Sequence, residues 1–273
     1  MPDIVNRIKQ ELSFEKVLMA AMKTPGVKVK RDVFLKKELK KHCSDEMIQY
    51  AIQNNPAKAG ISKKTINKIS QAVINLETTK VTGISVAASL PSSGAAVVAL
   101  GAATVDITSY FACILRVVQE LAYLYGFDQF DFTEDNVDSE TMNYALIFLG
   151  VMFGVQGAAS ALRELANVVA KQVAKKLSQK ALTKGTVYPI VKKVVGKIGI
   201  RLTKQVFADT VASAVPVVGS VVSGGLTFAM FRPGCMKLRR NLMSYALCDP
   251  EYYKVVTDEG GNASEEDSNT LKP

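Results

Sequence analysis

The sequence lacks tryptophan, has a single histidine and has only four cysteines in 273 residues. The cysteines (Cys43, Cys113, Cys235 and Cys248) are far apart and form no CxxC pair, so their spacing favours neither a zinc site nor a disulfide framework. The Walker A, GxSxG and HExxH motifs are also absent. These absences predict a protein that binds rather than catalyses, without a metal or cofactor, and with reduced thiols as in a cytosolic setting.

Charge is absent from two long stretches, residues 81–105 and 210–231. Each is long enough to cross a bilayer, but a high content of Ala, Gly and Ser makes both only weakly hydrophobic. Pro91 and Pro216 divide the stretches into arms too short to span a membrane individually. The favoured interpretation is two apolar hairpins buried in a helical bundle, and the alternatives are hairpins that dip into one leaflet or that span the membrane.

Apolar side chains recur at helical spacing through most of the chain, and strand-like alternation is scarce. The pattern predicts an all-α helical bundle that contains the two Pro/Gly-broken apolar hairpins. We expect an N-terminal helical subdomain at residues 1–78 and the bundle at residues 79–253. Residues 254–273 are polar and acidic, which is typical of a disordered tail.

Capping and breaking residues give the expected ends of several helices. Ser44 is expected to cap a helix, and either Ser62 or Thr65 to open the next one. Gly126 is expected to end a helix that Asp106 opens, and residues 232–234 (Arg-Pro-Gly) to end the second uncharged stretch. The expected helices span residues 3–22, 29–41, 62–76, 106–126, 163–184, 189–204 and 236–247, and the one at 163–184 is expected to continue an uncharged run at 141–162.

The net charge of +9 is concentrated in residues 161–248, which hold 15 basic and 2 acidic residues. Ten basic residues and no acid lie between Lys171 and Lys204. Exposed helices usually mix both signs, so this excess favours an anionic partner surface over merely solvated lysines. Nucleic acid is disfavoured because no stretch alternates basic with aromatic residues. The residues predicted to contact an anionic membrane or partner are Lys171, Lys175, Lys192, Lys193, Lys197 and Arg201.

Asp106, Arg116 and Glu120 form a possible buried polar site. Asp106 is the only charged residue between positions 81 and 115, which admits a buried carboxylate with a raised pKa. A helix N-cap is the favoured role for Asp106, because an amphipathic pattern follows it directly. Arg116 and Glu120, four residues apart, are expected to form a local ion pair.

Two segments, residues 103–128 and 213–242, resemble the two characteristic blocks of the EcsC protein family. The matching residues are Asp106, Gln119, Glu120, Ala122, Tyr125, Gly126 and Phe127 in the first block, and Pro216, Val217, Val218, Gly219, Arg239 and Arg240 in the second. The resemblance covers roughly residues 80–245. It implies an all-helical bacterial protein, cytoplasmic or attached to the inner face of the membrane, that accompanies an ABC transporter; it implies no activity and no catalytic residue.

The function expected from these features is docking on anionic lipid through basic amphipathic helices, peripheral to the inner membrane of a bacterium and beside a membrane-protein partner. Two alternatives remain open. One is a pore-forming or membrane-perturbing effector that uses the same hairpins. The other is a lipid-binding or cryptic hydrolytic protein whose pocket would carry Asp106, Glu120 or His42.

Overall fold

The structure is a computed structural model, and it describes residues 14–88, 96–128, 139–174 and 224–256. Every regular element in this part of the chain is a helix. No strand occurs among these residues. The all-α prediction is therefore confirmed. The predicted helix at residues 189–204, residues 257–273 of the predicted tail and most of the predicted basic residues lie outside the described ranges. Residues 254–256, predicted as the start of the disordered tail, are instead helical.

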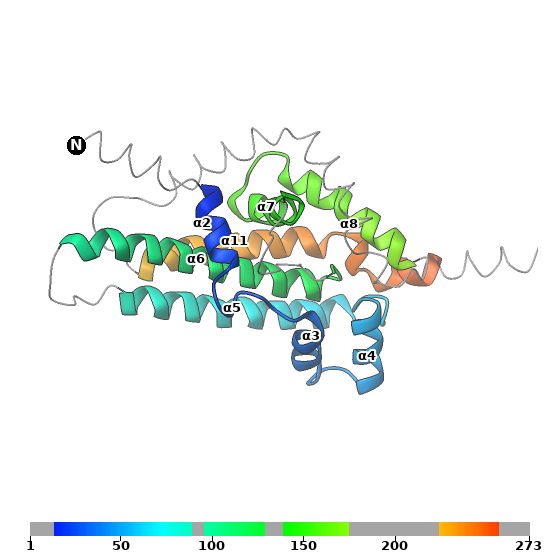
Figure 1. Cartoon of the computed structure of the whole chain (residues 1–273). Helices are drawn as coiled ribbons and strands as arrows, with labels where there is room; N and C mark the ends of the chain where they lie inside the picture. Colours follow the sequence, from blue (N-terminus) through cyan, green and yellow to red (C-terminus); the bar gives the residue numbers. More distant parts are fainter. Residues whose placement is uncertain (1–13, 89–95, 129–138, 175–223, 257–273) are drawn as a thin grey trace, which may run out of the picture.

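Three long helices, α5 (Lys63–Ala88), α6 (Ala96–Leu124) and α11 (Gly224–Met243), form the body of the molecule. α5 and α6 run side by side in opposite directions, and α11 packs against both of them (Figure 1). The uncharged run at residues 81–105 thus belongs to the two arms of a helical hairpin, with Pro91 in the connection that lies outside the description.

α7 (Ser139–Phe153) and α8 (Ala158–Ala174) cover the opposite side of α11. The sequence predicted that the uncharged run at residues 141–162 continues straight into the basic helix. In the structure the two are separated by a turn. Gly154 and Gly157 adopt φ values of 79° and 83°, and the chain turns between the two helices. The left-handed backbone that these glycines allow is the physical reason for the break.

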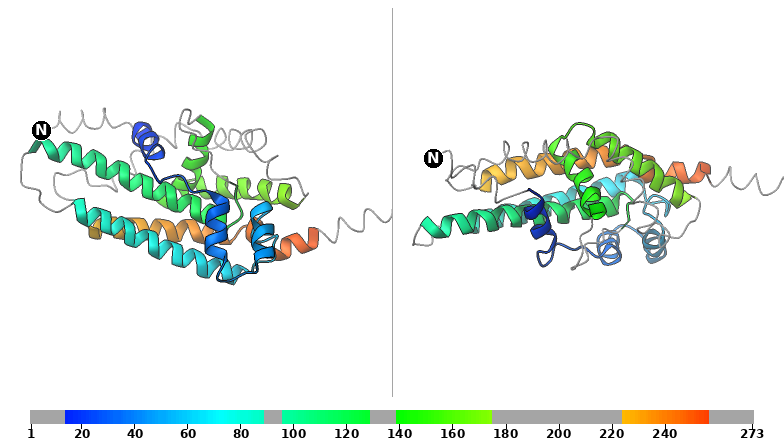
Figure 2. Two further views of the ribbon diagram at one scale, coloured as in Figure 1. Left: turned by 60° about the horizontal axis from the view of Figure 1, so that its bottom comes forward. Right: turned by 45° about the horizontal axis from the view of Figure 1, so that its top comes forward.

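α2 (Phe14–Met22), α3 (Arg31–Leu39) and α4 (Asp45–Gln53) precede the body. α2 and α3 pack against α6, and α3 pairs with α4 (Figure 2). The predicted cap is confirmed: the backbone N–H of Met47 donates to Ser44 Oγ at 3.3 Å. Ser62 caps α5 in the same way, through the N–H of Thr65 at 3.1 Å. α5 then continues without a break past residue 78, so the expected domain boundary there falls inside a helix.

The Arg-Pro-Gly sequence predicted that the helix ends at residues 232–234. Instead, α11 contains Pro233 and continues to Met243. Proline removes a backbone donor from a helix, so the helix needs support on both sides of the break. That support comes from a stripe of side chains at helical spacing that are at most 1% exposed: Phe231, Cys235, Leu238 and Leu242. Pro233 itself is exposed.

Candidate functional site

A cluster of four charged side chains is enclosed between α5 and α6. Glu77 and Lys80 come from α5, and Arg116 and Glu120 come from α6. The carboxylates of Glu77 and Glu120 are only 2% and 4% exposed, whereas about a third of Arg116 and nearly half of Lys80 face solvent. The cations therefore close the outer side of a buried acidic pair.

Arg116 links both carboxylates. Its Nη2 lies 3.2 Å from Glu120 Oε1, and its Nε lies 3.7 Å from Glu77 Oε1. The third nitrogen, Nη1, donates to the carbonyl oxygen of Gly26 at 2.8 Å. Lys80 Nζ contacts Glu77 Oε1 as well. The predicted pairing of Arg116 with Glu120 is thus present, and it extends to Glu77 and to the loop that follows α2.

Burial raises the pKa of Glu120 to about 8, and the neighbouring Glu77 carboxylate adds to the shift. Arg116 and Lys80 act in the opposite direction on this pKa. Glu120 Oε2 is buried and has no hydrogen-bond partner, which is costly for an ionised carboxylate in a low-dielectric site. Near neutral pH the cluster therefore holds one proton on Glu120.

The cluster is suited to holding helices together rather than to chemistry. Burial and the Glu77 carboxylate raise the pKa of the Cys113 thiol to about 11, so it stays a protonated, weakly nucleophilic thiol. Within the described ranges no three His, Cys, Asp or Glu side chains gather as metal ligands do. Arg116, whose guanidinium occupies the space between the carboxylates, would itself repel a metal cation.

The sequence predicted that Asp106 opens its helix, and this prediction is wrong. α6 begins at Ala96, so Asp106 lies well inside the helix and is not its N-cap. Glu77 was not predicted as a member of the site, although it is the only acid in α5. Sequence reasoning missed it because Glu77 and Glu120 lie on different helices, and only the packing of the α5–α6 hairpin brings them together.

The residues that resemble the first EcsC block join separate parts of the fold. Gln119, which is fully buried, accepts from the N–H of Val29 at 3.1 Å and donates to the carbonyl oxygen of Val27 at 2.8 Å. Tyr125 donates to Asn67 Oδ1 at 2.9 Å. Both side chains thus tie α6 to the N-terminal part of the chain, which gives them a structural role.

Gly126 ends α6 as predicted. Its φ is +94°. The N–H of Gly126 donates to the carbonyl oxygen of Tyr123, and the N–H of Phe127 donates to that of Ala122. This pair of hydrogen bonds is the Schellman motif. A Cβ at Gly126 would lie 2.8 Å from Asn55 Nδ2. Asn55 cannot move away, because Nδ2 donates to Leu247 O and Tyr253 Oη.

Arg239 from the second block connects α11 to α5. Its Nε donates to Ser70 Oγ at 2.9 Å and its Nη2 to the carbonyl oxygen of Asn67 at 3.2 Å. Ser70 Oγ lies 2.9 Å from Tyr125 Oη. The two blocks, which are far apart in sequence, therefore meet in one hydrogen-bond network across three helices.

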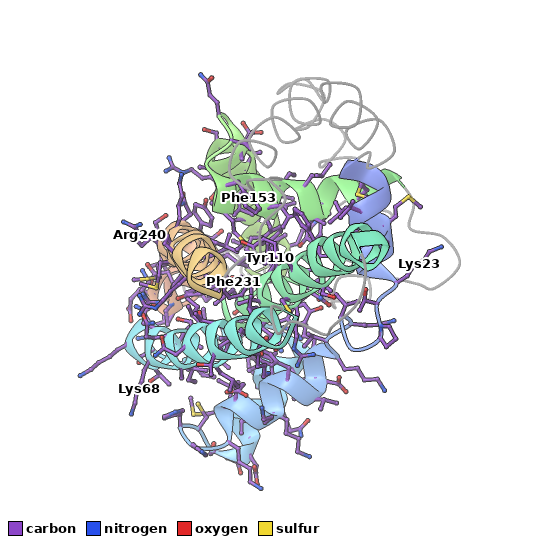
Figure 3. The ribbon with its side chains drawn as sticks, turned by 90° about the vertical axis from the view of Figure 1, so that its left-hand side faces the viewer. Lys23, Lys68, Tyr110, Phe153, Phe231 and Arg240 are labelled. Atoms are coloured by element: carbon purple, nitrogen blue, oxygen red, sulfur yellow. The ribbon has the colours of Figure 1, made fainter. Side chains whose placement is uncertain are left out.

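α5 and α11 carry several exposed basic residues. Besides Lys63 and Lys80, which pair with Asp249 and Glu77, these are Lys64, Lys68, Lys237 and Arg240; we call these four residues the α5–α11 basic surface. Lys68 and Arg240 project on the same side of the molecule in Figure 3. α11 contains no acid, and the only acid of α5 is the buried Glu77. No acidic side chain of these two helices therefore offsets the surface charge.

Of the basic residues predicted to contact a membrane or partner, only Lys171 lies in the described part of the chain. It is exposed on α8, while Leu165, Val169 and Val173 of the same helix are at most 3% exposed. α8 is thus amphipathic, as predicted, as far as Ala174. Lys175, Lys192, Lys193, Lys197 and Arg201 lie outside the described residues.

No family model, curated protein or solved structure matches the chain. The EcsC resemblance therefore rests on the two motif blocks alone. Within the described ranges, no helix has the length and apolarity needed to cross a bilayer.

Proposed function

We propose that this protein docks on anionic lipid at the inner surface of a bacterial membrane and acts there by binding rather than by catalysis. The observation that carries the proposal is the α5–α11 basic surface, with four exposed cations and no acidic side chain on the same two helices except the buried Glu77. Lysine and arginine side chains near an anionic bilayer contribute about 1 kcal/mol each to its attraction.

α8 extends the same chemistry. Its exposed Lys171 begins the run of ten basic residues without an acid that ends at Lys204. Helices with a buried apolar face and a basic outer face are typical of proteins that lie on membranes. We include in the proposal a membrane-protein partner such as an ABC transporter, on the strength of the EcsC resemblance.

Neutralising the α5–α11 basic surface tests the proposal. We expect the variant K64Q/K68Q/K237Q/R240Q to bind phosphatidylglycerol-containing vesicles up to about 1000-fold more weakly than the unchanged protein, since four contacts of about 1 kcal/mol are lost. Sedimentation with vesicles measures the binding. The remaining affinity should fall further as salt is added, because the other basic residues are screened.

A matched control separates this surface from net charge. The variant K36Q/K37Q/K40Q/K41Q removes the same number of exposed lysines from and just after α3, where Asp32 and Glu38 already offset them. We expect nearly unchanged binding from the control. Equal weakening by both variants would show that net charge, and not the α5–α11 basic surface, attracts the lipid.

A further inference from the structure

Three uncharged helical segments meet at one end of the body. They are residues 81–88 at the end of α5, residues 96–105 at the start of α6 and residues 224–231 at the start of α11. All three point towards the same end in Figures 1 and 2, away from α3 and α4. We call these segments the uncharged end. The fold thus brings parts of both uncharged stretches of the sequence together.

The length of the uncharged end matches one leaflet of a bilayer. At about 1.5 Å per residue, the segments of α5 and α6 are about 12 and 15 Å long. The hydrocarbon core of a bilayer is about 30 Å thick, so such segments reach about halfway through it. Within each helix the backbone groups pair with one another, as an apolar surrounding requires, except the last four carbonyl groups of α5 and the first four N–H groups of α6 and of α11.

Basic and aromatic residues border the uncharged end. Lys80 directly precedes the segment of α5, and Arg232 directly follows the segment of α11. Tyr110 lies one helical turn after Asp106 on α6, and its ring packs edge-on against Phe231 with centroids 6.4 Å apart. The hydroxyl of Tyr110 is buried and does not reach a headgroup layer, whereas lysine and arginine beside an apolar segment can meet the lipid phosphates. Asp106 is the one acid at this level of the three helices.

We propose that the uncharged end enters the near leaflet of an anionic bilayer, with Lys80 and Arg232 at the level of the phosphates. This inference rests on the proposed function and specifies how the protein meets the lipid. Lys68 and Arg240 of the α5–α11 basic surface lie on one side of the body (Figure 3), so a body that meets the bilayer obliquely brings that side and the uncharged end into contact with it. The protein is then held by apolar insertion as well as by charge.

Single tryptophans test insertion without background, because the chain has none of its own. L100W and V98W lie two positions apart on α6 within the uncharged end, so the two probes lie on different faces of the helix. The control is L76W on α5, where the leucine is 49% exposed and lies before Lys80. Each protein is mixed with phosphatidylglycerol vesicles that contain lipids brominated along their acyl chains.

We expect the emission of at least one α6 probe to shift to shorter wavelength and to lose intensity with brominated lipid, while the L76W control keeps its emission. Protein that co-sediments with the vesicles but shows no quenching of either α6 probe would overturn the inference and leave surface docking standing. Probes that are already blue-shifted without vesicles and do not change with them would show that protein covers this end, which also overturns it. Failure to bind vesicles at all would overturn the proposed function and this inference with it.

Discussion

Replacing Glu120 by glutamine is expected to stabilise the protein increasingly as pH rises from 5 to 8.5. The folded-state pKa of Glu120 is about 8, against an ordinary value of 4.5. A group with a raised pKa binds its proton more tightly in the folded state, so its contribution to stability is greatest below pH 4.5 and is lost as pH rises to 8. Glutamine copies the protonated carboxyl and avoids this loss.

The size of the effect follows from the same pKa. The difference in unfolding free energy between E120Q and the unchanged protein should grow by up to about 1.4 kcal/mol per pH unit, and reach several kcal/mol at pH 8. The charged groups that act on Glu120 are Glu77, Arg116, Lys80 and Glu38, and both proteins retain them. The difference between the two curves therefore isolates Glu120.

Urea unfolding at several pH values measures this difference. The control is E46Q, because Glu46 is an exposed acid in the first turn of α4. Its curve should stay within about 0.5 kcal/mol of the unchanged protein, as is usual for surface substitutions. Parallel curves for E120Q and the unchanged protein across the whole pH range would contradict a proton held on Glu120.

Replacing Arg31 by methionine is expected to cost about 3 to 5 kcal/mol of stability. Arg31 is only 5% exposed. Its Nε donates to Phe127 O at 3.2 Å, and its other nitrogens donate to carbonyl oxygens at the end of α4, among them Ile52 O at 2.7 Å and Asn54 O at 3.3 Å. Without the guanidinium, these carbonyl groups at the end of α4 and beyond α6 lose their donor in a buried position.

Thermal or guanidinium unfolding of R31M measures the loss, and K36M, at an exposed position of the same helix α3, serves as the control. R31K should fall between the two, because one ammonium group cannot reach all the carbonyl groups that the planar guanidinium contacts. If R31M is as stable as K36M, the junction between α3, α4 and the end of α6 does not depend on Arg31.

The sequence predicts the features that depend on neighbouring residues. The Ser44 cap and the end of α6 at Gly126 are both confirmed. Each depends on a local rule, such as a side-chain oxygen near a free N–H or a glycine in a left-handed turn. The pairing of Arg116 with Glu120 belongs here as well, since the two residues are four apart on one helix.

Features that depend on tertiary packing were predicted poorly. Proline normally ends a helix, but α11 continues through Pro233 because buried side chains lie on both sides of it, Phe231 before and Cys235 after. Asp106 has the sequence context of a cap, yet α6 begins at Ala96 and packs against α5 and α11. Glu77 joins Glu120 only through the α5–α6 hairpin, and no spacing along the chain indicates that contact.

Flotation of the unchanged full chain with vesicles shows whether charge brings this protein to an anionic bilayer. Vesicles of phosphatidylcholine, with and without phosphatidylglycerol, are compared at low and high salt. We expect flotation with the phosphatidylglycerol vesicles at low salt, less at high salt, and none with phosphatidylcholine alone. Equal flotation with both kinds of vesicle, or none with either, would contradict it.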